Sequence, residues 1–221
     1  MEAVALSPEF WTTLASPVVE SSVLAMEPGA GKVALDDDYL DDIAAAFGQI
    51  VDSKSPFTSG HSARVAEMTE SIAQRLGVPS ARRRWLRRGA LLHDLGKLGV
   101  SNAILDKPGK LDAEEWICMR QHAAHTEAIL SRIDAFSELA RVAGAHHERL
   151  DGAGYPRGLR ADEIMLETRI ITTADIFDAL TADRPYRGAV PIVEALAMMG
   201  ETVGTALDPL CFEALKGTLG R

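Results

Sequence analysis

Apolar residues recur at a helical spacing along most of this chain, with polar residues between them. The first such segment begins at Asp36, carries acids in its first turn, and is expected to form an amphipathic helix. The positions expected on one apolar face of that helix are Leu40, Ile43, Ala44, Phe47 and Ile50. A second segment begins with His61 at the head of an apolar row and stops at Gly77. The row continues through Val65, Met68, Ile72 and Leu76.

A third helical segment, from Ser80 to Gly96, has a strongly basic first half. Ser80 suits an N-cap, and Gly96 is available as the terminating residue. Between them the segment runs through several arginines and becomes apolar at Leu91 and Leu92. We interpret the arginines as a solvated helix face rather than an anion site.

The second half of the chain continues the helical pattern. Asp112 and Glu115 have the spacing of a capping box, which predicts a helix that carries His122 and His125. A helix that runs into a double histidine is expected next, then a turn-rich loop with the sequence GAGYPRGL. The remaining predicted helices lie near 136–148, from 168 to a stop at Pro185, and within 191–217 as one or two helices.

These segments predict an all-α protein in two parts. Residues 1–36 are broken by Ser, Pro and Gly, and we expect a short helix near Phe10 and Trp11 followed by a connector. Residues 37–221 are expected to form one helical domain, because their periodic segments share the helical spacing and are rich in Ala, Leu, Arg and Glu.

Composition narrows the possible functions. A formal net charge of −9 argues against a nucleic acid polymer as partner, because neutralising its phosphates needs a basic surface. Cys118 and Cys211 lie beside apolar neighbours, and we expect two buried, unreactive thiols in a reducing compartment. No run of about 18 apolar residues is present, so no membrane segment is expected. We predict a cytoplasmic protein or the cytoplasmic part of a larger one.

A set of side chains suited to metal binding lies on the predicted helices or at their ends. The set consists of His61, His93, Asp94, His122, His146, His147 and Asp175. Facing helices of a bundle can project such side chains into one shared pocket. A single histidine on an apolar row can equally be a hydrogen-bonded core residue, so the prediction rests on the set as a whole.

Two acids favour a metal site over a set of hydrogen-bonded core residues. Asp94 lies at the inner end of an apolar helix, where an unpartnered carboxylate is costly. Asp175 lies between Ile171 and Ala179, one turn to either side, and has the same need for a cation. Asp178 is the competing acid on that helix.

The histidines differ in their surroundings. His146 and His147 would point about 100° apart on a helix, but at a frayed helix end both rings can turn inward. His125 lies one turn after His122 without a flanking acid, and we exclude it from the ligand set.

Imidazole and carboxylate ligands together suit Mn, Fe or Zn better than Mg or Ca. With Asp94 as a bridge, the set matches two divalent cations, which can clamp the attacking and leaving oxygens of phosphoryl transfer and hold a hydroxide as nucleophile. We therefore predict hydrolysis of a phosphoester. The basic residues expected to hold the anionic substrate are Lys97, Arg184 and Arg187, with a solvated surface charge as the alternative for each.

The chain resembles the HD-GYP domain, a branch of the HD metal-dependent phosphohydrolases, over roughly residues 38–217. The segments that carry the resemblance are HSARV, LLHDLGKLGVSNAILDKPGKL, MRQH, AHHERLDGAGYPRGL and ADIFDALTADRPYR. It implies an HD-type helical bundle with a five-helix core and additional C-terminal helices. It also implies hydrolysis of cyclic di-GMP to linear pGpG, or onward to GMP, with iron or manganese as the metals. Residues 1–36 lie outside the match and resemble the tail of an upstream module found in longer members of the family.

The resemblance also implies roles for individual residues. The ligands implied for one metal are His61, His93, Asp94 and Asp175, and those for the other are Asp94, His122, His146 and His147. The signature loop would be Gly154, Tyr155 and Pro156, and the substrate phosphate would contact Lys97, Arg184 and Arg187. Phe57 stands where some members carry a glutamate that admits a third metal. Two metals, and pGpG as the product, are therefore expected.

Two alternatives to cyclic di-GMP hydrolysis stay open. The domain can be a non-catalytic receptor that docks a protein partner, a diguanylate cyclase or an adaptor, on the loop around Tyr155. It can also be an HD phosphohydrolase for another nucleotide, including a mixed cyclic dinucleotide. The oligomeric state, with a homodimer as one option, and any upstream signal are open at this point.

Overall fold

This computed structural model describes most of the chain. The described residues are 35–55, 59–183 and 188–220, together with Val18 and Ser21. Close contacts divide the chain into two compact units, Met1–Asp36 and Asp37–Arg221. The expected helix near Phe10 and Trp11 lies outside the described residues.

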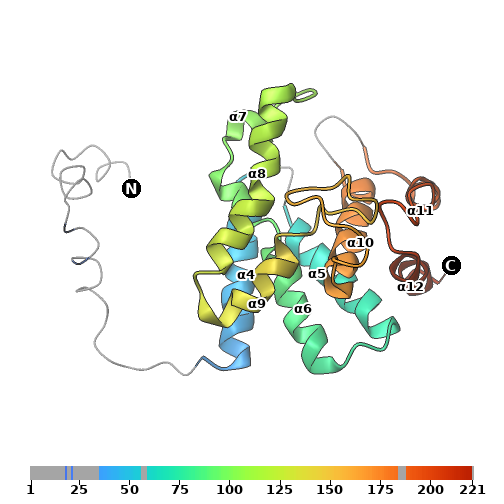
Figure 1. Cartoon of the computed structure of the whole chain (residues 1–221), viewed down its shortest axis with the longest axis horizontal. Coiled ribbons are helices and arrows are strands. Elements are labelled where there is room, and N and C mark those ends of the chain that lie inside the picture. The colour runs from blue at the N-terminus through green and yellow to red at the C-terminus, as the bar shows by residue number, and fades with distance from the viewer. Residues whose placement is uncertain (1–17, 19–20, 22–34, 56–58, 184–187, 221) are drawn as a thin grey trace. The chain divides into compact units, whose positions relative to one another are not determined.

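The unit Asp37–Arg221 is built from helices joined by turns and loops (Figure 1). Its first helices are α4 (Asp37–Ser53), α5 (His61–Arg75), α6 (Ser80–Leu92), the 3₁₀ turn η1 (Leu95–Gly99) and α7 (Asn102–Leu105). The later ones are α8 (Ala113–Leu130), η2 (Asp134–Phe136), α9 (Ser137–Ala143), α10 (Leu166–Thr181), α11 (Ile192–Gly200) and α12 (Pro209–Thr218). The described residues contain no β-strand, which confirms the all-α class. None of the described helices is long and apolar enough to cross a bilayer.

Helix α5 lies at the centre of the bundle and packs against α4, α6, α10 and α12. The predicted apolar row of α5 is confirmed, because Val65 and Ile72 are fully buried and Met68 and Leu76 pack against the core. Burying side chains of this size stabilises a fold by about 1.5–3 kcal/mol each. The helix ends where expected, with Gly77 at a φ of +75°, a conformation that glycine adopts without strain. The helical period therefore located the central helix correctly.

Three predictions for α4 and α6 were wrong. The predicted apolar face of α4 is confirmed at Leu40, Ile43 and Ala44 but fails at Phe47 and Ile50, which are 36% and 50% exposed. In its second half the helix buries Gly48 and Val51 instead. Ser80 is the first residue of α6 rather than its cap, which is Pro79. The predicted end at Gly96 also failed, because α6 stops at Leu92 and Gly96 lies within η1.

The arginines of α6 are not a simple solvated face, which corrects another prediction. Arg88 is buried, and its guanidinium pairs with the carboxylates of Asp37 and Asp41 on α4. Arg82 lies 2.9 Å from both Glu138 and Glu167, at the starts of α9 and α10. The charges that looked like a solubilising surface therefore connect α6 to three neighbouring helices.

Helix α8 begins at the predicted capping box: the carboxylate of Asp112 accepts from the Glu115 amide at 2.9 Å, and the Glu115 carboxylate accepts in return. Its middle packs tightly on η1, since a Cβ at Gly96 would lie 2.0 Å from the carbonyl oxygen of His122. Glycine is required at this approach. Cys118 on the outer face of α8 is exposed, contrary to prediction, whereas Cys211 is buried.

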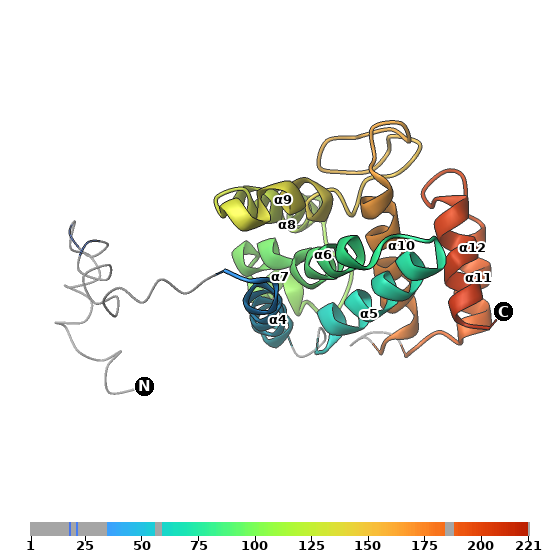
Figure 2. The ribbon, with the colours of Figure 1, turned by 90° about the horizontal axis from the view of Figure 1, so that it is seen from below.

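The loops on either side of α10 complete the unit. Helix α9 ends at Ala143, earlier than the predicted 148, so His146 and His147 lie in a turn. The long loop 144–165 then leads into α10 (Figure 2). Helix α10 ends at Thr181, ahead of Pro185, which lies outside the described residues. The two predicted C-terminal helices are present as α11 and α12, on the far side of α10 in both views.

Candidate metal centre and active site

Seven predicted ligands, from three helices and from the turns that follow two others, converge in the interior of the bundle. His61 heads α5, His93 and Asp94 follow α6, His122 is on α8, the double histidine follows α9, and Asp175 is on α10. Six of these residues are buried, and His147 is half-buried. Three groups among them have ligand atoms within 4.8 Å of one another. These groups are His61, His93 and Asp94; His93, His146 and Asp175; and His122, His146 and His147.

Asp94 lies between two sets of imidazoles. Its Oδ2 is 3.5 Å from Nε2 of His61 and 3.3 Å from Nε2 of His93. Its Oδ1 faces the other way, 3.5 Å from Nε2 of His122 and 3.8 Å from Nε2 of His146. Each carboxylate oxygen of Asp94 therefore faces a different set of imidazoles. We call His61, His93 and Asp175 the first half of the centre, and His122, His146 and His147 the second half.

Backbone carbonyls fix the orientation of three of the rings. Nδ1 of His93, His122 and His146 each lies 2.6 Å from the carbonyl oxygen three residues earlier. Because a carbonyl can only accept, each Nδ1 carries the proton and each Nε2 presents a lone pair to the centre. Such support is typical of metal-binding histidines.

The residues fit divalent transition-metal ions. Nε2 of His122 lies 3.4 Å from Nε2 of His146 and 3.1 Å from Nε2 of His147, so nitrogen atoms face one another at short range. Nε2 of His93 and Oδ1 of Asp94 are buried and have no hydrogen-bond partner among the described residues. Leaving such polar atoms buried and unsatisfied is costly, and converging lone pairs repel unless a cation lies between them. Imidazole and carboxylate donors are the ligands of Mn, Fe or Zn.

The acids of the centre are held in their ionised form. Burial alone would raise the pKa of Asp94, but Lys97 and the imidazoles of His93 and His61 hold it well below its usual range. Burial likewise opposes ionisation of Asp175, and its contact with His61 outweighs this to lower its pKa. Both carboxylates are therefore available as anionic ligands at neutral pH.

The histidines divide between the two halves. For His61, burial would lower the pKa, but contacts with Asp175, Asp178 and Asp94 raise it well above the ordinary value. In the second half, burial lowers the pKa of His122 and His146 and takes that of His147 to about 3. The first half attracts positive charge strongly, while the second half consists of neutral imidazoles.

Asp178, considered in the sequence as a competitor of Asp175, has a supporting position. Its Oδ2 lies 2.7 Å from Nδ1 of His61, and its Oδ1 accepts from Nε of Arg64 at 2.6 Å. It is one turn away from Asp175 on α10 and touches the far side of the same ring. A carboxylate that accepts from Nδ1 directs Nε2 of His61 toward Asp94 and Asp175.

Two buried threonines anchor the backbone near the ligands. Oγ1 of Thr126 on α8 donates to the carbonyl of His93 at 2.9 Å and accepts from the Gly96 amide at 2.9 Å. Oγ1 of Thr172 on α10 donates to the carbonyl of His146 at 2.7 Å. Each half of the centre is therefore tied to a neighbouring helix through a backbone carbonyl.

The loop after the double histidine is organised by Glu148, which is buried. Its two carboxylate oxygens accept from the backbone amides of Arg157 at 2.7 Å and Leu159 at 2.9 Å. A Cβ at Gly154 would lie 2.6 Å or less from backbone atoms of residues 147–149, so the loop folds back closely over them. As a result the Tyr155 ring lies 4.7 Å from the His147 ring, between centroids.

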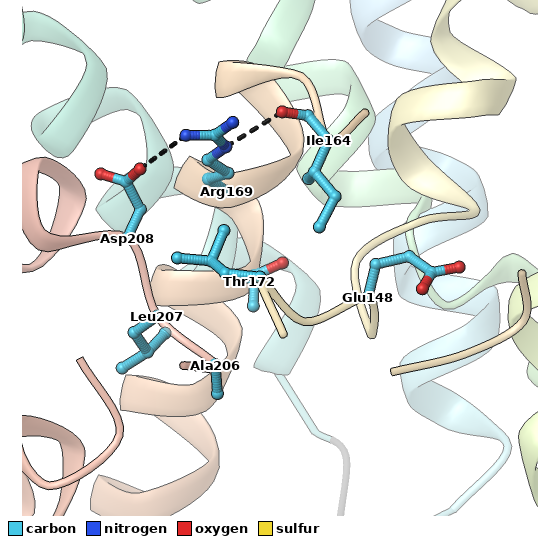
Figure 3. Close-up of a pocket in the computed structure, with 8 residues that line it drawn as sticks. Glu148, Ile164, Arg169, Thr172, Ala206, Leu207 and Asp208 are labelled. Atoms are coloured by element: carbon cyan, nitrogen blue, oxygen red, sulfur yellow. Dashed lines mark hydrogen bonds and ion pairs between the residues drawn. The ribbon is translucent and has the colours of Figure 1, made fainter. Parts of the chain in front are cut away.

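Figure 3 shows the layer behind this loop, where Glu148 and Thr172 line a small cavity. On its far side Arg169 of α10 donates to the Ile164 carbonyl at 3.0 Å and to the Asp208 carboxylate at 2.8 Å. Asp208 in turn caps α12 through the amides of residues 210 and 211. The loop and α12 are therefore fastened to the helix that carries Asp175.

The remaining predicted site residues have varied positions. Lys97 follows Asp94 into η1, and its Nζ pairs with Oδ2 of that acid. His125 is exposed beside Gly99 and belongs to none of the three ligand groups. The predictions for Phe57, Arg184 and Arg187 lie outside the described residues.

The chain matches a known protein family. The family model described as HD domain matches residues 46–210. The chain belongs to the HD-domain family. Its quoted motifs and its named relatives place it in the HD-GYP branch.

Several relatives of this HD-GYP chain have named activities. The 3′3′-cGAMP-specific phosphodiesterase 3 of Vibrio cholerae is 58% identical over 99% of this chain and 48% of the relative. The cyclic di-GMP phosphodiesterase response regulator RpfG of Xanthomonas campestris is 39% identical over 72% of this chain and 42% of the relative. The HD-GYP chain thus spans about half the length of such relatives or less.

Two solved structures resemble the HD-GYP chain. The crystal structure of the cyclic GMP-AMP specific phosphodiesterase V-cGAP3 of V. cholerae matches with a TM-score of 0.57 and 54% identity, over 99% of this chain and 50% of that one. An HD-GYP-type protein of Bdellovibrio bacteriovorus, Bd1817, matches with a TM-score of 0.63 and 20% identity, over 84% of this chain and 65% of that one. The second match supports the HD-type fold alone.

The sequence did not reveal the supporting position of Asp178 or the contributions of Glu148 and the two anchoring threonines. Asp178 had a signal, since a second acid one turn after Asp175 shares its helix face. Glu148 had a weaker one as an acid directly after two histidines. Thr126 and Thr172 had none, because a threonine in a helix gives no hint of which carbonyl it will reach.

Proposed function

We propose that this domain is a metal-dependent phosphodiesterase that hydrolyses a 3′3′-linked cyclic dinucleotide, with 3′3′-cGAMP as the preferred substrate. The observation that carries the proposal is Asp94, whose two oxygens face two separate sets of imidazoles. The 58% identity to a 3′3′-cGAMP-specific phosphodiesterase supports the choice of substrate.

The proposed ligands of one ion are Asp94 and the first half, and those of the other are Asp94 and the second half. Two divalent ions, iron or manganese in our proposal, supply a water that is activated near neutral pH and offset charge on the phosphate. Lys97, beside Asp94, is proposed to donate to a phosphate oxygen, and Arg184 and Arg187 to bind the substrate anion. Tyr155 is proposed to form a wall of the site beside His147 of the second half.

The proposed reaction adds water across one P–O3′ bond. The phosphorus gains the water oxygen and loses O3′, which leaves with a proton, so the product is a linear dinucleotide with a 5′-phosphate. Release of this linear product, rather than full conversion to mononucleotides, agrees with Phe57 in place of a third-metal ligand.

A second candidate substrate is cyclic di-GMP. The support is the 39% identity to RpfG and 36% identity to a cyclic di-GMP phosphodiesterase of Thermotoga maritima. The two candidates share the ring and both phosphates and differ in one base.

The deciding experiment is anaerobic purification, loading with Mn(II) or Fe(II), and a direct competition between 3′3′-cGAMP and cyclic di-GMP, with products separated by chromatography. We expect linear dinucleotides, formed faster from 3′3′-cGAMP. Faster turnover of cyclic di-GMP would reverse the order of substrates. A fully loaded protein that binds but does not hydrolyse either would overturn the enzyme proposal in favour of a receptor that docks a partner on the Tyr155 loop.

A further inference from the structure

An exposed cluster of two aromatic rings and one cation borders the second half of the centre. The α8 ledge, as we name it, consists of Trp116, Arg120 and Tyr155. The Arg120 guanidinium lies 5.3 Å from the Tyr155 ring centroid and 5.8 Å from that of Trp116. Tyr155 in turn stacks against His147, with 4.7 Å between centroids. The inner end of the ledge, Tyr155, is therefore in contact with a proposed metal ligand.

The ledge has features that packing does not explain. Trp116 is 46% exposed, although an indole is a large apolar group. Arg120 is exposed and has no carboxylate within 4.0 Å among the described residues, whereas Arg64, Arg82 and Arg88 each pair with acids. The guanidinium lies within 6 Å of two aromatic rings instead, the range of a cation–π interaction. A guanidinium without an acid partner keeps N–H groups available to donate to a ligand.

An aromatic face combined with a free guanidinium edge matches the chemistry of a guanine base. Purines stack on tryptophan and tyrosine rings. Guanine presents two adjacent acceptors, O6 and N7, to a bidentate arginine, whereas adenine places an amino donor at the corresponding position and repels one of the two N–H groups. A bidentate arginine beside a stacking ring would therefore favour guanine over adenine.

The position of the ledge connects this preference to the reaction. A phosphate at the metal centre carries its nucleoside outward, and Tyr155 is the first ring between the centre and the solvent-exposed part of α8. We propose that Trp116 and Arg120 form a guanine-binding subsite of the active site, with Tyr155 as the wall between base and metal centre. This inference rests on the proposed function and adds base specificity to it.

The test compares Arg120→Lys, which keeps the charge and removes the bidentate edge, with Trp116→Leu, which keeps an apolar group and removes the stacking face. KM and kcat are measured for cyclic di-GMP, 3′3′-cGAMP and cyclic di-AMP. We expect Arg120→Lys to raise KM about 5- to 150-fold for the two guanine-containing substrates and to leave cyclic di-AMP nearly unchanged. Trp116→Leu is expected to raise KM for all three. Metal content stays at the wild-type value in both variants.

The matched control is Arg132→Lys, since Arg132 is an exposed arginine that follows the end of α8 and is not part of the ledge. Its kinetics are expected to equal the wild type. Unchanged KM values in both ledge variants would overturn the subsite. An equal rise for all three substrates in Arg120→Lys would overturn the guanine assignment and point to a phosphate contact.

A binding measurement separates this inference from the proposed function. Calorimetric titration of metal-free protein with cyclic di-GMP and with cyclic di-AMP needs no turnover. We expect tighter binding of cyclic di-GMP by the wild type and loss of that preference in Arg120→Lys. Preference without turnover would support the subsite while the hydrolase proposal fails. Turnover without any preference would overturn the subsite alone.

Discussion

The two halves of the metal centre share Asp94 but are supported in different ways. In the first half, two imidazoles combine with a second carboxylate, Asp175, and His61 is held from behind by Asp178. The second half has three imidazoles, two of them held by backbone carbonyls. The first half therefore carries more negative charge around its ligand atoms, and its histidines have raised pKa values.

This difference separates two ways to build a site for one type of ion. An anionic half draws a cation by charge, so its affinity depends on the acids and on what orients them. A neutral half depends on geometry, because three nitrogen lone pairs must converge from α8 and a turn. Substitutions in the two halves should therefore differ in what they change, and the following experiments test this from the largest expected effect to the smallest.

Asp94→Ala is expected to remove both ions, because Asp94 is the residue whose oxygens face both halves. Metal content, measured by mass spectrometry after anaerobic loading and desalting, should fall from about two equivalents to about zero. His125→Ala is the control, since this histidine is exposed and outside the ligand groups. Retention of one full equivalent by Asp94→Ala would show that the acid does not bridge.

Asp178→Asn tests the charged support of the first half. The amide can still contact His61, but the negative charge is lost and the bond to Arg64 is weakened. We expect one of the two ions to bind about 10- to 100-fold more weakly, with the other unaffected, in a metal titration followed by calorimetry. Asp162→Asn, at an exposed acid, is the control. Equal weakening of both sites would mean that the halves are not independent.

Glu148→Gln tests the loop that covers the second half. Glutamine is neutral and offers one acceptor oxygen where the carboxylate offers two, so the amides of Arg157 and Leu159 both lose a charge-assisted bond and one of them loses its acceptor. Such a bond contributes about 1.5–3 kcal/mol, which predicts about 10- to 100-fold faster hydrogen exchange at these amides.

The readout for Glu148→Gln is exchange mass spectrometry of the peptide that spans residues 149–160, with metal content measured in parallel. Both ions should remain bound, because Glu148 contacts the loop rather than a ligand ring. The exposed Glu201 provides the control in Glu201→Gln. Loss of an ion from Glu148→Gln would place this residue in the support of the histidines themselves.

The same contrast explains how much the sequence could predict. Helical spacing located α5 and α10 and placed His61 and Asp175 on buried faces, because apolar rows on a helix must meet a core. Chemistry then brought the seven candidate ligands into one set, since acids and histidines buried together favour a shared cation. These two arguments needed no knowledge of how the helices are arranged.

The supports depend on that arrangement, and the sequence did not reveal them. The sequence suggested that Arg88 is a surface charge, yet Arg88 is buried and pairs with two acids of α4. Thr172 and the carbonyl of His146 are far apart along the chain and meet because α10 packs beside the turn after α9. Local pattern predicts which residues are inward, whereas the partner of each polar atom depends on tertiary packing.

Thr172→Val is expected to have the smallest effect of the series. It keeps the side-chain shape and removes the 2.7 Å hydrogen bond to the His146 carbonyl. Loss of one buried hydrogen bond lowers the free energy of unfolding by about 1 kcal/mol, measured by denaturant titration of metal-free protein. If the second half depends on geometry, its ion should also bind several-fold more weakly while the first half is unchanged.

Thr168→Val separates stability from metal binding. Thr168 lies one turn earlier on α10, is equally buried, and donates to the Val142 carbonyl at 3.3 Å, away from any ligand. In Thr168→Val the free energy of unfolding should fall by a similar or smaller amount than in Thr172→Val. The affinity of both metal sites should stay unchanged. If both threonine variants weaken the second half equally, general loosening of α10 explains the effect. If only Thr172→Val does so, a single hydroxyl on a backbone carbonyl sets the geometry of a neutral metal site, as Asp178 orients a ligand in the charged one.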